Sequence, residues 1–128
     1  MASNITVDTL TKGSTTLNTD EIVDTNSNQI CKAWVNFNGQ GTIAIRDSYN
    51  VSSITDGGTG EYVINFSNTM ANSNYSISGI AGHTSSSGDR SRRVTTHTVA
   101  TSSLRINTTY SLDTYVDVPL VSVQVFGD

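Results

Sequence analysis

The chain has 128 residues, of which 35% are hydrophobic and 14% are charged, with 7 Lys and Arg against 11 Asp and Glu. A chain of this length forms one domain with one core. Its acidic balance argues against nucleic acid as a partner, because a phosphate-binding surface needs accumulated positive charge.

Thr, Ser and Asn, which make up 49 of the 128 residues, favour strands and turns over helix interiors. No helical stripe competes with this pattern, so composition predicts an all-β fold. No window approaches eighteen apolar residues, and we expect no membrane insertion. Cys31 is the only cysteine, which excludes an internal disulfide and a cysteine-rich metal site.

Residues 1–31 differ from the rest because their apolar residues are scattered and they contain no aromatic residue. Alone, such a segment buries too little surface to fold. We expect an extended N-terminal shaft or attachment segment whose short β pieces lie against something else. A flexible leader is the alternative.

Residues 32–66 carry a repeated period-2 pattern. Residues 32–37 place three apolar side chains on one face, and the turn signal at 38–41 leads into a second strand at 42–47. A second hairpin follows, in which the glycine-rich turn 57–60 leads into residues 61–66. There Tyr62, Ile64 and Phe66 alternate and face one side of the strand.

The remaining elements continue the alternation. Strands are expected around residues 75–79, at 93–101 and 104–110, and in a last strand ending at Gly127. The polar gap at 82–93 is either a surface loop or an edge in which the strands continue irregularly. About eight short strands predict an antiparallel β-sandwich or jelly-roll-like tip domain over residues 32–128. The residues expected in the core or between subunits are Trp34, Val35, Phe37, Ile43, Ile45, Ile64, Phe66, Ile77 and Val123.

Three of the seven basic residues, Arg90, Arg92 and Arg93, fall within four positions of the polar gap, near His83 and Asp89. Guanidinium groups bind carboxylate, sulfate or phosphate groups in a bidentate manner, so these five residues form a candidate receptor-binding site for a surface glycan. Pairing with acids of a neighbouring subunit and simple solvation are the alternatives.

Other chemistry finds little support in the sequence. His97, in a predicted strand, is a candidate metal ligand on a trimer axis, although an exposed or hydrogen-bonded histidine is favoured, and we expect no cofactor. No catalytic motif is present, and the carboxylates of Asp47, Asp56 and Glu61 cannot be assigned to a glycosidase pair. We therefore expect no enzyme, with a depolymerase fragment as a rival.

The stretch "KAWVNFNGQGTIAIRDSYNVSSITDGGTGEYVINF", residues 32–66, closely resembles a segment of the C-terminal parts of tail fibre and related structural proteins of tailed phages, of marine and cyanobacterial type. The resemblance covers about residues 30–81 and the closing residues 121–128. The matching features are residues 33–39, 45–48, 50–56, 58–60 and 62–66. Between Gly82 and Pro119 we recognise no resemblance.

This resemblance implies a non-enzymatic virion protein at the distal end of a tail fibre, assembled as a homotrimer, that recognises a host-surface glycan. Residues 1–31 would then attach it to other fibre or tail proteins. The family supplies no catalytic residues. A purely structural virion protein, such as a head decoration or a fibre-trimerisation module, is the alternative.

Overall fold

The computed structural model describes residues 9–13, 15–18, 30–83, 91–111 and 114–127. Every regular element in these ranges is a β-strand, and every pairing is antiparallel, which confirms the all-β prediction. The described ranges hold no helix long and apolar enough to cross a membrane.

Eleven strands follow one another along the described chain. They are β1 (Thr9–Lys12), β2 (Thr15–Asn18), β3 (Cys31–Asn38), β4 (Ala44–Tyr49), β5 (Val51–Gly58), β6 (Glu61–Phe66), β7 (Ser76–Gly82), β8 (Arg92–Val99), β9 (Ser103–Tyr110), β10 (Thr114–Tyr115) and β11 (Leu120–Phe126).

Strands β1 and β2 form a two-stranded sheet of their own, with Leu10 opposite Leu17. The first strand of the larger sheets, β3, begins at Cys31, next to the expected boundary at residue 32. The division into a shaft or attachment segment and a tip domain stays a prediction.

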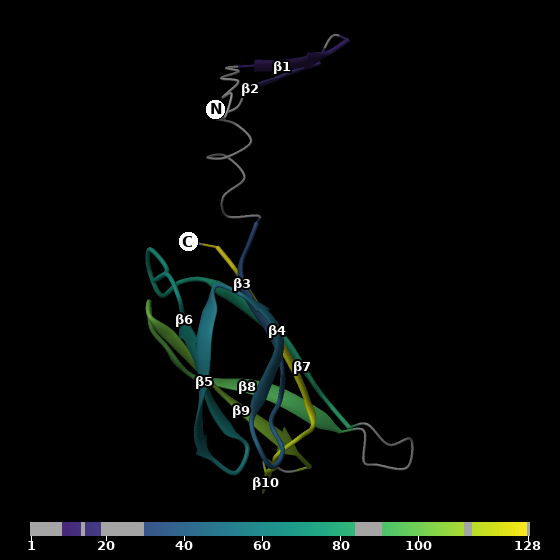
Figure 1. The fold of residues 1–128 in the computed structure, drawn as a ribbon, viewed down its shortest axis with the longest axis vertical. Coiled ribbons are helices and arrows are strands. Elements are labelled where there is room, and N and C mark those ends of the chain that lie inside the picture. Colours follow the sequence, from purple (N-terminus) through teal and green to yellow (C-terminus); the bar gives the residue numbers. More distant parts are fainter. Residues whose placement is uncertain (1–8, 14, 19–29, 84–90, 112–113, 128) are drawn as a thin grey trace, which may run out of the picture.

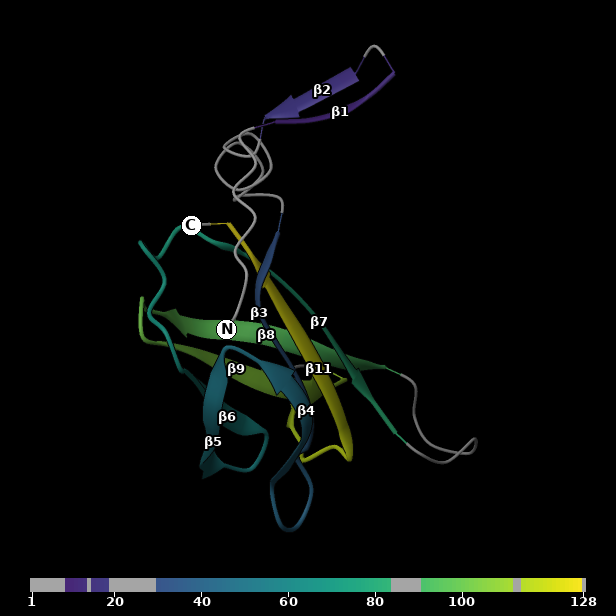
Figure 2. The same ribbon diagram turned by 45° about the horizontal axis from the view of Figure 1, so that its top comes forward.

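Two larger sheets pack against each other. One has the order β4-β3-β11-β7; the other places β6, β8 and β10 beside β9, with β5 beyond β6. Figures 1 and 2 show these sheets as two layers, with β8 and β9 crossing β7 and β11. This arrangement agrees with the predicted β-sandwich, whereas jelly-roll winding is not confirmed.

The core lies between the two sheets and follows the period-2 rule, because alternate side chains of each strand turn inward. Phe37 of β3 and Tyr62 of β6 meet edge to face with ring centroids 5.1 Å apart, and Phe66 meets Tyr75 at 5.9 Å. The buried apolar residues are Ala33, Val35, Phe37, Tyr62, Ile64, Phe66, Met70, Tyr75, Leu104, Ile106, Val118, Val121, Val123 and Val125.

The expected core is confirmed at Val35, Phe37, Ile64, Phe66 and Val123. The other four expected residues lie at its margin or outside it. Ile43 and Ile77 are partly buried against the core, and Trp34 is partly buried. Ile45 is 37% exposed, because it belongs to the edge strand β4, where the pairing with β3 shifts between Asn36 and Phe37. Ile45 is thus outside the core of the single chain, and its expected place between subunits stays a prediction.

The chain passes from one sheet to the other at Asn50, between β4 and β5. Its φ of 55° lies in the left-handed region, which asparagine tolerates better than most residues. Its side chain holds the corner: Oδ1 accepts from the Asn68 backbone N–H at 2.7 Å, and Nδ2 donates to the Lys32 carbonyl at 3.1 Å.

A second junction centres on the buried hydroxyl of Tyr62. It lies 2.6 Å from the Gly39 carbonyl, to which it donates, and 3.2 Å from Asp117 Oδ1. Asp117 Oδ1 also accepts from the Gly60 N–H at 2.7 Å. A Cβ at Gly39 would come within 2.6 Å of the hydroxyl, and one at Gly60 within 2.6 Å of the Thr108 carbonyl, so both positions require glycine.

Replacing Tyr62 with Phe should lower the free energy of unfolding by about 1–3 kcal/mol, because the Gly39 carbonyl loses its buried donor. Chemical denaturation at neutral pH measures this. Tyr49→Phe is the matched control, since Tyr49 is exposed, and it should change stability by less than about 0.5 kcal/mol. Equal effects of the two changes would contradict a structural role for the Tyr62 hydroxyl.

The Tyr62 hydroxyl should also make the stability of the protein depend on pH in the alkaline range. Burial raises the pKa of Tyr62 from 10.0 to about 12. Between these values the unfolded chain has lost the proton and the folded chain has not, so stability falls as pH rises, by roughly 2–3 kcal/mol in total. Tyr62→Phe should remove most of this slope in unfolding measured at pH 9 and pH 11.5. Burial also raises the pKa of Tyr75, so a smaller slope remains.

Candidate functional site

The predicted arginine cluster does not converge on one surface. Arg92 and Arg93 are successive residues of β8, so their side chains leave opposite faces of the sheet. The Val94 side chain points between the two sheets, toward Gly79 of β7. Arg92 lies two residues before Val94 on the same strand, so its side chain leaves the same face of the sheet. The Arg92 guanidinium lies 4.8 Å from the centre of the Tyr110 ring.

Arg92 is therefore only partly exposed, and its Nε and Nη1 are buried without a hydrogen-bond partner within the described ranges. Arg93 faces outward opposite Thr109 and makes contacts of its own within the chain. His83 follows β7 and is exposed. Asp89 and Arg90 lie outside the described residues.

His97 lies where the pairing of β8 with β9 shifts, between Thr96 and Thr98. The ring is exposed, with Nδ1 2.9 Å from Thr98 Oγ1. No group of three or more His, Cys, Asp or Glu side chains that could hold a metal occurs among the residues described. A site shared by three chains on an axis stays a prediction.

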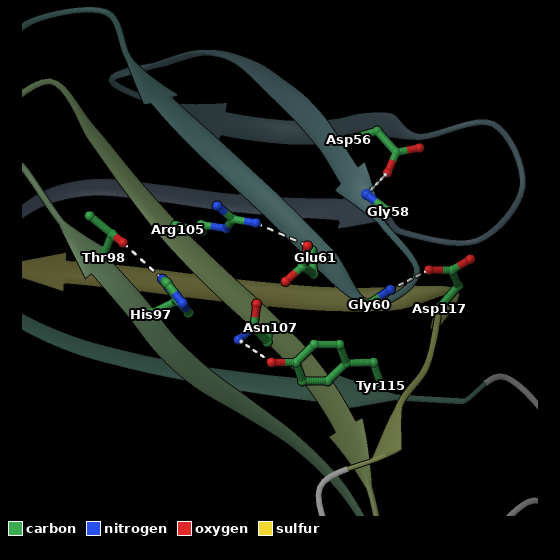
Figure 3. A network of polar contacts seen from close by, with 10 residues as sticks. All are labelled: Asp56, Gly58, Gly60, Glu61, His97, Thr98, Arg105, Asn107, Tyr115 and Asp117. Atoms are coloured by element: carbon green, nitrogen blue, oxygen red, sulfur yellow. Dashed lines mark hydrogen bonds and ion pairs between the residues drawn. The ribbon is translucent and has the colours of Figure 1, made fainter.

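A different set of polar side chains gathers on the outer face of the five-stranded sheet (Figure 3). Glu61 of β6 lies opposite Asn107 of β9, and Arg105 lies two residues before Asn107 on the same side. Arg105 Nη2 and Glu61 Oε2 are 2.9 Å apart, with side chains 36% and 21% exposed. Tyr115 of β10 lies opposite Thr109. We call these five residues, Glu61, Arg105, Asn107, Thr109 and Tyr115, the polar face.

Two members of the polar face are buried although they point away from the core. Asn107 is 5% exposed between Glu61 and Thr95 on the neighbouring strands, and Thr109 is 2% exposed between Tyr115 and Arg93. Asn107 Nδ2 lies 3.5 Å from the Tyr115 hydroxyl, at the limit of a hydrogen bond.

Three polar atoms at this place are buried without a hydrogen-bond partner in the described part of the chain: Arg105 Nε, Asn107 Oδ1 and Thr109 Oγ1. Leaving a buried donor or acceptor unpaired costs about 1–3 kcal/mol, so buried polar groups in folded proteins are normally satisfied. Their hydrogen-bonding capacity is therefore unused here, and a ligand or water reaches it where the neighbouring side chains move aside.

The chemistry of the polar face suits recognition of a hydroxylated molecule. It combines a carboxylate, a guanidinium, a carboxamide and two hydroxyls with the ring of Tyr115, which is 44% exposed. Pockets for small molecules commonly pair a few placed polar groups with an aromatic surface. The other carboxylates considered from the sequence lie elsewhere: Asp47 on β4 of the opposite sheet, and Asp56 on β5, where its Oδ1 accepts from the Gly58 N–H at 2.9 Å.

Sequence reasoning missed this site, although one signal was present. Residues 104–110, "LRINTTY", were predicted as a strand, and period-2 alternation places Arg105, Asn107 and Thr109 on the face opposite Leu104 and Ile106. Because Thr and Asn occur throughout the chain, that polar face did not stand out.

The four-stranded sheet has a hollow of about 190 Å³ on its surface. It is lined by Ser78, Gly79, Ile80, Ser122 and Gln124. Ser78 Oγ donates to Gln124 Oε1 at 3.4 Å, and none of the lining residues contributes a buried unpaired polar atom. The polar face is therefore the stronger candidate.

Two neighbouring threonines should respond in opposite ways. Thr108 Oγ1 donates to the Val116 carbonyl at 2.6 Å, so Thr108→Val should lower the free energy of unfolding by about 1–3 kcal/mol. Thr109→Val removes an unpaired hydroxyl and should leave stability unchanged or raise it by up to about 1 kcal/mol. Thermal and urea unfolding of both variants measure this, and equal destabilisation would show that the Thr109 hydroxyl is satisfied in the folded chain.

Comparison with protein-family models, curated proteins and solved structures found no match for this chain. The candidate site therefore depends on the burial, contacts and unpaired atoms of the polar face itself.

Proposed function

We propose that this protein is a tail-fibre tip protein of a phage virion that recognises a glycan on the host surface without enzymatic activity, through the polar face. The observation that carries the proposal is the set of buried, unpaired polar atoms of Arg105, Asn107 and Thr109 beside the exposed ring of Tyr115. Together they offer hydrogen bonds and an apolar ring surface, which are the two needs of a sugar ligand.

The division of the chain supports this proposal. The stretch that resembles phage fibre proteins, residues 32–66, forms β3 to β6, one hairpin in each sheet, and supplies much of the core. Four of the five residues of the polar face fall between residues 82 and 119, where no resemblance is recognised. A shared framework with a divergent outer face is expected of proteins that recognise different hosts.

We also propose a homotrimer, attached through residues 1–31 to other fibre or tail proteins. Among the described residues, the large hydrophobic side chains that are exposed include Ile45 and Tyr49 of β4 and Ile80 of β7, on the two edges of the four-stranded sheet. Burying them between copies would add roughly 25 cal/mol per Å² of apolar area. Packing through this layer would leave the polar face toward the cell.

Binding to cells and to surface polysaccharides tests the function. The labelled protein should bind a panel of marine bacterial and cyanobacterial cells or their extracted polysaccharides, and Tyr115→Ala should weaken binding about tenfold or more through lost stacking area. Gln40→Ala, in the exposed turn after β3, is the control and should bind as the original does. Absence of binding to every cell and polysaccharide would favour the purely structural role, as a head decoration or trimerisation module. Release of reducing sugar would reveal a depolymerase.

Molar mass by light scattering tests the assembly. We expect three chain masses, and a combined Tyr49→Ser and Ile80→Ser variant should dissociate at lower protein concentration, because it removes two exposed apolar groups. A single chain mass for the unchanged protein at high concentration would contradict the trimer.

A further inference from the structure

The hydrogen-bonding groups of the polar face are of mixed type. Arg105 Nε can only donate, Asn107 Oδ1 can only accept, and Thr109 Oγ1 can do both, and all three are buried and unpaired in the described part of the chain. On the proposed function that this site binds a glycan, we infer that its ligand is an uncharged saccharide ring, held through neighbouring hydroxyl groups.

Hydroxyls fit these atoms because each one both donates and accepts. One hydroxyl can accept from Arg105 Nε while its neighbour donates to Asn107 Oδ1. A carboxylate or sulfate accepts only, and would leave Asn107 Oδ1 unpaired. An ammonium group donates only, and would leave Arg105 Nε unpaired. A pair of sugar hydroxyls satisfies both kinds of atom.

The charge of the polar face points the same way. Arg105 is already paired with Glu61, with 2.9 Å between Nη2 and Oε2, so an anion that approaches Arg105 also meets the Glu61 carboxylate and is repelled. The sequence had suggested an acidic glycan bound by arginines. Of those in the described ranges, Arg92 is stacked on Tyr110 and faces away from this surface. Arg93 faces outward beside Thr109, at the end of the polar face away from Arg105, and makes contacts of its own within the chain.

The polar face also offers a place for the apolar side of a sugar ring. Tyr115 is 44% exposed, and Asn107 Nδ2 lies 3.5 Å from its hydroxyl, so the ring borders the unpaired atoms. In Figure 3 the carboxamide of Asn107 directs its nitrogen at Tyr115 and its oxygen toward the side of Glu61. Glu61 and Arg105 are partly exposed at the solvent side of the polar face, so a ligand there contacts the Glu61 carboxylate as well. The side chains that cover the buried atoms must move to admit it, a movement that surface side chains make rapidly.

The experiment compares acidic and neutral forms of the same saccharides, and a variant that lacks the negative charge of Glu61. The full-length protein is titrated with galacturonate oligosaccharides and with the same oligosaccharides after carboxyl reduction to galactose, together with host-surface polysaccharide before and after reduction. We expect reduced forms to bind at least as well as acidic ones, with little dependence on salt. Glu61→Gln should weaken binding about tenfold or more, because hydroxyls bond more strongly to a carboxylate than to an amide. Asp47→Asn, which makes the same charge change on the opposite sheet, should have no effect.

An acidic ligand would reverse these results. Preference for the unreduced forms, loss of affinity with salt and tighter binding by Glu61→Gln would overturn this inference while leaving glycan recognition standing. If neither cells nor any saccharide bind, the proposed function fails as well. Thermal unfolding verifies that Glu61→Gln is folded. If it is not, the comparison of reduced and acidic probes with the unchanged protein decides the inference alone.

Discussion

The hydroxyl of Tyr62 holds together three parts of the chain that the polar face depends on. It donates to Gly39 at the end of β3 and lies beside Asp117, whose carboxylate fixes the turn at Gly60. The Gly60 carbonyl accepts from the Thr108 N–H at 2.7 Å, and the Thr108 carbonyl accepts from the Val116 N–H at 3.0 Å. These bonds hold Tyr115 next to β9. The buried hydrogen bonds around Tyr62 therefore help to position the Tyr115 edge of the polar face.

Strand β9 serves the core and the surface at once. Leu104, Ile106 and Thr108 face inward, and Arg105, Asn107 and Thr109 face outward along the same six residues. Because β6 and β10 flank one side of β9 and β8 the other, the outward groups are covered by neighbouring side chains and held in position. A ligand that meets groups already ordered by the sheet loses less binding free energy to their immobilisation.

Period-2 alternation predicted the inward faces of β3, β6 and β11, because both neighbours of those strands are protein and burial follows the pattern directly. It failed for Ile45, where an edge strand and a shift in pairing override alternation. The polar composition of residues 82–93 suggested either a surface loop or an irregular strand edge with clustered arginines. Arg92 begins β8, where it pairs with Tyr110. These two residues are too far apart in the sequence for a local pattern to reveal their pairing. The burial of Asn107 and Thr109 likewise depends on two flanking strands.

The two outer faces of the sandwich differ in the groups that they present. The four-stranded sheet exposes large apolar side chains at both edges, whereas the five-stranded sheet covers polar atoms that lack partners in the described residues. Apolar groups gain free energy when another protein surface excludes water from them, and unpaired polar atoms gain it when a hydroxylated ligand supplies hydrogen bonds. If the four-stranded sheet joins copies as proposed, the polar face is repeated around the assembly, and several weak contacts of the proposed sugar ligand would then act together.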